Sequence, residues 1–178
     1  MIMKPRLRKF ALTVHVASSV GWLGAVVGFL APAVAGMTSQ DVQVVRGAYL
    51  MMELIARFAL IPLSLASLLT GFVQSLGTKW GLLRHYWVLF KLLINVSANI
   101  VLLMYTQTLS YLAGVAVQTN SDLRELRSPT AVIHAVAALL LLLIATTLSV
   151  SKPRGMTRYG QKKQREELAR PQRALSQP

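Results

Sequence analysis

The chain of 178 residues contains no cysteine and only 6 acidic residues. The lack of cysteine excludes disulfide bonds, thiol catalysis and cysteine-ligated metal ions. Charged residues amount to 14% of the chain, against about 25% in an ordinary soluble domain. Because the apolar residues, 54% of the total, gather into long runs, the composition is typical of a membrane protein.

Motifs that commonly carry catalysis are also missing. The sequence has no HExxH, no GxSxG, no phosphate-binding loop and no paired carboxylates. Only Glu53 stands at the edge of an apolar run, whereas ion-coupled transporters of this size normally use an acid inside the membrane. No repeat relates the two halves of the chain. We therefore expect a non-enzymatic protein and place a small-solute transporter third among the candidate functions.

Four apolar runs are long enough to cross a bilayer, which takes about 20 residues in a helix. They cover residues 10–36, 54–76, 86–112 and 130–150. We therefore predict an all-α fold, a four-helix transmembrane bundle within residues 1–150. The tail, residues 151–178, carries eight basic and two acidic residues, and we expect it to be disordered, or helical at most over residues 161–169.

Local signals place the starts of two helices. Ser128 is suited to cap the fourth helix, with Pro129 as its first residue, where a missing N–H costs nothing. Residues 38–41, Thr-Ser-Gln-Asp, resemble a capping box, so we expect the second helix to begin near Ser39. We expect it to lie partly along the outer surface and then to enter the membrane, with a bend at Pro62.

Basic residues set the expected orientation. The net charge is +13, and 15 of the 19 lysines and arginines lie before the first run, around the connection between the second and third, or in the tail. By the positive-inside rule, both termini are predicted to face the cytoplasm, with the protein in a bacterial inner membrane. The sequence Ala33-Val34-Ala35 resembles a signal-peptidase site. However, residues 10–30 exceed the usual apolar segment of about 7–15 residues, so we expect this run to remain as a span.

Small residues in the first run predict a helix-packing face. Gly21, Gly24 and Gly28 recur at helical spacing, the last two as a GxxxG motif. Helices in lipid associate through close contact at small residues, so we expect these glycines, together with Trp22, to pack inside the bundle. Packing of the same face between two chains is the alternative.

Three polar residues within the runs are expected to face the interior. Asn95 and Asn99 lie one turn apart on the third helix, and His134 lies near the outer end of the fourth. Because an amide facing lipid is costly, we expect hydrogen bonds to other helices, with candidate partners Ser18, Ser19, Gln74 and Thr146. A polar pathway or a ligand pocket around the two asparagines is the alternative.

His15 lies about five residues inside the first run, and a histidine within a membrane is a candidate functional residue. We expect a buried imidazole with a hydrogen bond inside the bundle. The alternative is a haem or copper ligand, with His85 from the same side of the membrane as the candidate second ligand. His134 is excluded as that ligand, because it lies near the opposite surface, roughly 15–20 Å away in height.

The segment around His85 also has a simpler interpretation. Trp80, Tyr86 and Trp87 form an aromatic group at the start of the third run, and Arg84 is long enough to reach lipid headgroups. We therefore expect these residues, and His85 with them, to anchor the chain at the membrane interface.

Two parts of the sequence resemble known bacterial membrane proteins. HVASSVGWLGAVVGFL resembles the first helix of a group that includes copper-resistance D-type membrane domains, through His15, Trp22, Leu23 and Gly24. SLLTGFVQSLGTKWGLLRHYWVLFKLL and TTLSVSKPRGMTRYG look like an uncharacterised family of predicted four-span integral membrane proteins, over nearly the full length. The resemblance implies a four-helix membrane bundle and assigns no activity. Copper routes use clusters of methionine and histidine, and this sequence has no comparable cluster.

Together these patterns favour a small accessory or interaction module of the membrane. Binding of haem or copper through His15 is the second candidate, and otherwise no cofactor is expected. The expected partners are the lipid bilayer, anionic headgroups beside the basic tail, and a membrane or cytoplasmic protein. No nucleic acid partner is expected, because topology accounts for the basic charge.

Overall fold

In the computed structural model, residues 3–77, 81–118, 125–153 and 155–175 are described. This part of the chain is almost entirely helical and contains no β-strand. Four helical stretches in it are long and apolar enough to cross a membrane: α1 (Pro5–Thr38), the stretch Val42–Gly77, α4 (Tyr86–Val117) and α5 (Thr130–Ser151). The expected all-α fold and multi-pass membrane character are thereby confirmed.

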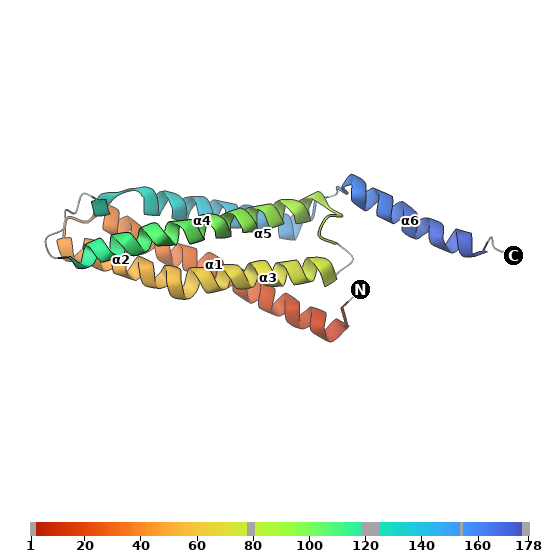
Figure 1. The fold of residues 1–178 in the computed structure, drawn as a ribbon, viewed down its shortest axis with the longest axis horizontal. Helices are drawn as coiled ribbons and strands as arrows, with labels where there is room; N and C mark the ends of the chain where they lie inside the picture. The colour runs from red at the N-terminus through yellow and green to blue at the C-terminus, as the bar shows by residue number, and fades with distance from the viewer. Residues whose placement is uncertain (1–2, 78–80, 119–124, 154, 176–178) are drawn as a thin grey trace.

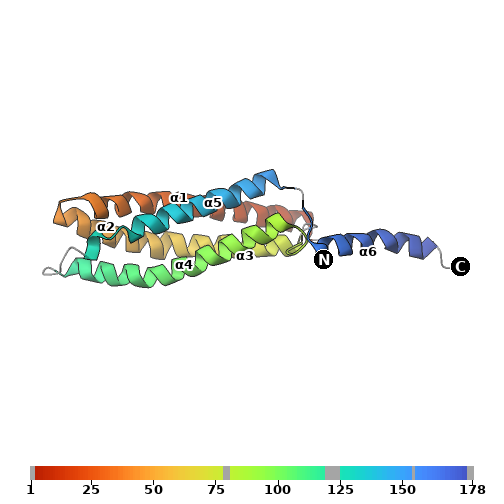
Figure 2. The same cartoon turned by 90° about the horizontal axis from the view of Figure 1, so that it is seen from above.

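The four stretches run side by side in alternating directions (Figures 1 and 2). The second stretch joins α2 (Val42–Ile55), a π-helical turn η1 (Ala56–Leu60) and α3 (Ile61–Gly77) without interruption. Both α1 and α4 contact α2, α3 and α5. Short connections favour this antiparallel packing of sequence neighbours. The buried core includes two aromatic side chains from α1, Trp22 and Phe29, and one from α2, Tyr49.

The outward faces of these helices are apolar along much of their length. Large side chains such as Phe10, Val20, Phe58 and Met104 are more than half exposed. An apolar surface this extensive is characteristic of a protein in contact with lipid rather than water. At 1.5 Å per residue, the 34 residues of α1 are about 50 Å long, which exceeds a hydrocarbon core of about 30 Å.

The start of α2 differs from the expected one. Thr38 is still part of α1, where its hydroxyl donates to the Val34 carbonyl oxygen at 2.8 Å, so it does not cap the next helix. Asp41 is the cap, because its carboxylate accepts from the Gln43 N–H at 2.8 Å. Rather than lying apart along a surface, α2 packs against α1 and α4 and fully buries Val45.

The π-helical turn lies just before Pro62. The Ile61 N–H donates to the carbonyl of Ala56, five residues earlier, instead of four. Proline has no N–H, so the carbonyl of Phe58 loses the partner that an α-helix would provide. Wide turns of this kind are one way in which helices accommodate such a defect. The departure from α-helix next to Pro62 is thus a π-helical turn, whereas the sequence predicted a bend.

The fourth apolar helix begins close to the expected position. The Ser128 hydroxyl accepts from the Thr130 N–H at 3.4 Å, and the Ile133 N–H donates to the Pro129 carbonyl at 3.0 Å. Regular helix begins at Thr130, and the short 3-10 helix η2 (Glu125–Arg127) precedes it. Pro129 is therefore the N-cap residue of α5, and not its first helical residue as the sequence predicts, while Ser128 stands one position before the cap.

The tail forms a helix, α6 (Arg158–Leu175), which is longer than the segment 161–169 for which helix was expected. It continues beyond the end of the four packed helices, roughly along the long axis of the molecule (Figures 1 and 2). Most of the described tail is thus helical. Its first turn is fixed by contacts with the connection between α3 and α4, described below.

Candidate functional site

A row of hydrogen bonds, here called the polar seam, joins α1 to α3. The Gln74 side-chain amide donates to the Ala11 carbonyl at 3.0 Å. One turn further along, His15 meets the Ser67 carbonyl oxygen, and the hydroxyls of Ser19 and Ser67 lie 2.7 Å apart. Three successive turns of α1 are therefore tied to α3 by polar groups inside an otherwise apolar structure.

His15 is the centre of the polar seam. Its Nδ1 lies 3.1 Å from the Ser67 carbonyl oxygen and 3.1 Å from Thr70 Oγ1. A carbonyl oxygen can only accept, and the Thr70 hydroxyl already donates to the Ala66 carbonyl at 2.6 Å, so Nδ1 must carry the proton. The lone pair of the imidazole is then on Nε2.

The ring of His15 fits against Gly71. A β-carbon at Gly71 would lie 3.1 Å from His15 Cε1, which is closer than side chains ordinarily approach. The expected buried, hydrogen-bonded histidine agrees with this position, since His15 is half-buried with a partner on another helix. The partners on α3 were not among those expected from the sequence.

His85, the proposed second ligand, has other neighbours. It caps α4, its ring centroid is 6.4 Å from that of Trp87, and its backbone pairs with Met156. No group of three His, Asp or Glu side chains that could hold a metal ion occurs within the part of the chain that the structure describes. Among the described residues, the Nε2 atom of His15 is the one candidate ligand atom here for haem or copper. Neither His85 nor His134 lies beside it.

The glycines of α1 divide into two groups. Gly21 faces α3, where a β-carbon would lie 3.3 Å from the side chain of Leu63. Gly24 and Gly28 are exposed, and a β-carbon at either would meet nothing within 4 Å. The prediction that the GxxxG pair packs inside the chain is therefore wrong. Trp22 lies on the buried face of α1, about 200° around the helix from Gly24.

The two asparagines use their amides within α4. Asn95 donates to the Lys91 carbonyl and Asn99 to the Asn95 carbonyl, both at 2.9 Å. Asn99 is 4% exposed, and its Oδ1 has no hydrogen-bond partner among the described residues. The expected bonds to Ser19 and Gln74 are not formed, because those two side chains belong to the polar seam.

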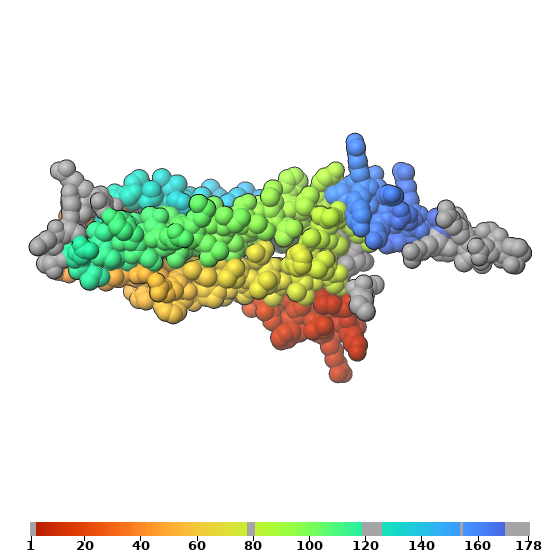
Figure 3. All heavy atoms as spheres, in the orientation of Figure 1, coloured from red at the N-terminus to blue at the C-terminus, as the bar shows by residue number. Residues whose placement is uncertain are grey.

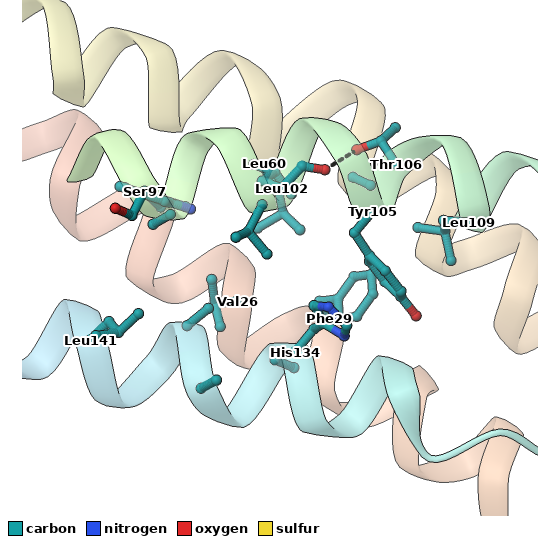
Figure 4. A pocket seen from close by; sticks show the side chains of 17 residues that line it. Val26, Phe29, Leu60, Ser97, Leu102, Tyr105, Thr106, Leu109, His134 and Leu141 are labelled. Carbon is teal, nitrogen blue, oxygen red and sulfur yellow. Dashed lines mark hydrogen bonds between the residues drawn. The ribbon is translucent and has the colours of Figure 1, made fainter. Parts of the chain in front are cut away.

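A cavity of about 230 Å³ lies between α1, α4 and α5 (Figure 4). Tyr105 and His134 border it and stack at 4.2 Å between ring centroids, with planes 15° apart. His134 Nδ1 lies 2.7 Å from the Thr130 carbonyl, so it carries a proton as in His15. His134, like Tyr105, is therefore placed at a cavity wall. Sequence reasoning missed this cavity, although the alanine-rich face of α5, notably Ala135 and Ala138, was a signal for it.

The residues expected at the membrane interface have different surroundings. Arg84 forms an ion pair with Glu167 of α6 at 2.7 Å instead of extending freely. Trp87 is buried, and the Lys91 ammonium lies 5.6 Å from its ring centroid. Tyr86 is exposed, as an interfacial anchor requires. Trp80 lies outside the described residues.

The start of the tail docks on the connection between α3 and α4. The Thr157 N–H donates to the Arg84 carbonyl at 3.0 Å, and the Thr157 hydroxyl both donates to the Leu83 carbonyl and accepts from the Gly160 N–H at 3.0 Å. Thr157 thus caps α6. A β-carbon at Gly160 would clash with the Arg84 carbonyl oxygen, so only glycine fits this approach. The space-filling view places α6 at this end of the molecule (Figure 3).

No family model matches the chain, and neither a curated protein nor a solved structure does.

Proposed function

We propose that the chain is a non-enzymatic interaction module of the bacterial inner membrane, formed by a four-helix bundle with both termini in the cytoplasm. In this proposal α6 is the docking element. The observation that carries it is the fixed attachment of α6, through Thr157, Gly160 and the Arg84–Glu167 ion pair. A tail that served only to set topology would need charge but no such built contact.

The position of α6 favours a protein partner. If the four long helices cross the bilayer, α6 points away from it, because it continues along the long axis of the molecule (Figure 2). Its basic side chains, such as Lys162, Lys163 and Arg165, are exposed there. An acidic protein surface fits this arrangement, and long-range attraction would speed encounter. Adhesion to anionic headgroups is the competing outcome.

Photo-crosslinking in cells tests this function. A photo-reactive residue replaces the exposed Gln164 in the full chain, so that no charge is lost. We expect a discrete crosslinked protein, which disappears when Lys162 and Lys163 are changed to glutamate. G160A should weaken the crosslink, because its methyl group cannot fit against Arg84. The matched control is G155A, whose methyl group would only contact Tyr86 at 3.7 Å. Crosslinks to lipid alone would refute the proposal.

A haem-binding role is the second candidate, and one observation favours it. His15 donates its Nδ1 proton to a backbone carbonyl, an arrangement that orients the Nε2 lone pair of metal-ligating histidines. The resemblance of the first helix to copper-resistance D-type domains also favours this second candidate function. A visible absorption spectrum of protein purified from haem-replete cells tests it. A stoichiometric Soret band that is lost in H15A would establish it, and a spectrum without that band would exclude haem.

A further inference from the structure

The cavity between α1, α4 and α5 opens sideways. Its inner walls are buried residues such as Trp22 and Phe29, both less than 5% exposed. Other lining residues, on α4 and α5, are exposed at the outer surface: Ser97, Val101, Ala137 and Leu141. Figure 4 shows α4 and α5 on either side of the space, with Tyr105 and His134 meeting across one end. In a protein that spans a bilayer, the opening between these two helices faces hydrocarbon.

The walls of the cavity do not suit water. The Thr106 hydroxyl donates to the Leu102 carbonyl at 2.7 Å, and His134 Nδ1 is engaged by Thr130. The Tyr105 hydroxyl is buried without a hydrogen-bond partner among the described residues. A buried water needs two to four polar partners, and the polar side chains on these walls are few, chiefly Ser97, Tyr105 and His134. The remaining lining residues are largely alanine, valine and leucine, so the space accepts apolar groups.

The volume limits what can enter. At about 230 Å³, the cavity exceeds the roughly 150 Å³ of an engineered apolar cavity that stays dry and binds benzene. It is smaller than the 300 Å³ or so at which pockets for drug-sized molecules begin. A segment of a hydrocarbon chain fits, whereas a whole lipid does not.

We propose that this cavity binds a segment of the acyl chain of a membrane phospholipid, which enters between α4 and α5. Acyl chains surround the opening at very high local concentration if the helices span a bilayer. An empty cavity would leave the side chains around it without dispersion contacts on one side, and a chain segment restores them. The inference needs the four helices to span the membrane and is independent of any docking by α6.

Trp22 provides a direct probe, because its ring is 2% exposed and lines the cavity. In the full chain carrying W80F and W87F, Trp22 is the only tryptophan. This variant is placed in nanodiscs of phosphatidylcholine whose acyl chains carry bromine, which quenches tryptophan at contact. We expect strong quenching relative to nanodiscs of unbrominated lipid, since a chain in the cavity touches the indole. Absence of quenching in correctly inserted protein would overturn the proposal.

Variants separate entry into the cavity from general exposure to lipid. A138L fills the interior, while A137F obstructs the exposed opening and so places little demand on folding. We expect both to abolish the quenching of Trp22. The matched control is A31L, at an exposed alanine of α1 away from the cavity, which should leave quenching unchanged. Equal quenching in A137F and A31L would overturn the proposal. Failure of the protein to enter nanodiscs would instead refute the membrane span.

Discussion

Replacing His15 with leucine tests the polar seam, because it keeps a side chain of similar volume and removes one hydrogen bond. The expected loss of stability depends on the two acceptors of the His15 bond, the Ser67 carbonyl and Thr70 Oγ1. Thr70 Oγ1 retains its bond to the Ala66 carbonyl, and the Ser67 carbonyl lies within α3, where the helix backbone still supplies an N–H donor. Both acceptors therefore keep a hydrogen-bond partner in H15L. The cost of about 1–3 kcal/mol for an unsatisfied buried polar group does not arise. The expected loss is about 0.6 kcal/mol, the average for single hydrogen bonds between membrane helices, and at most about 1.7 kcal/mol.

Unfolding of H15L by a denaturing detergent in mixed micelles, followed by circular dichroism, measures this loss. The control is T13A, because Thr13 is exposed and donates only to the Lys9 carbonyl of its own helix at 3.1 Å. A free energy of unfolding for H15L equal to that of T13A would show that the His15 bond contributes nothing. A loss well above 3 kcal/mol would also refute the reasoning, since it would require His15 to hold more than one bond.

Further predictions concern packing, topology and the tail. G21L should destabilise the protein by about 1–3 kcal/mol in the same unfolding assay, because its side chain must displace Leu63, whereas G24L should be neutral or stabilising because it meets nothing. A reporter fused after Pro178 should be active only in the cytoplasm, and periplasmic activity would refute the predicted orientation. Truncation after Ser151 should leave the four long helices folded, as judged by the helical content of the purified protein. Loss of folded protein would mean that the docked tail stabilises them.

The four long helices could be predicted from the sequence because long apolar runs in lipid have few alternatives to a helix. The sequence does not predict which face of α1 turns toward the other helices. Lipid and protein interior are similarly apolar, so Gly21, Gly24 and Gly28 look equivalent in the sequence. Their difference comes from the bulk of Trp22 and Val26, which turn one face of α1 toward α4 and α5 and leave the GxxxG pair outside.

The site was predictable to a smaller extent. A buried, hydrogen-bonded His15 was expected, but its partners on α3 depend on how two helices of different length are set against each other. The attachment of the tail was not foreseen, because its charges predict a solvated chain, while the attachment depends on two small residues, Thr157 and Gly160. Thr157 followed three residues later by Gly160 was the available signal, since threonine is a favoured cap.

The π-helical turn Ala56–Leu60 can also be seen as a single inserted residue. Four buried side chains follow one another here at intervals of four residues: Met52, Ala56, Leu60 and Ser64. An α-helix of 3.6 residues per turn cannot keep side chains at this spacing on one face. The wider turn absorbs this excess. Deleting one residue, such as the exposed Phe58, would restore an α-helix and rotate α2 by about 100° relative to α3. Tyr49 would then leave the core, so this turn keeps the two halves of one span in phase, and the length of the chain here is fixed to the residue.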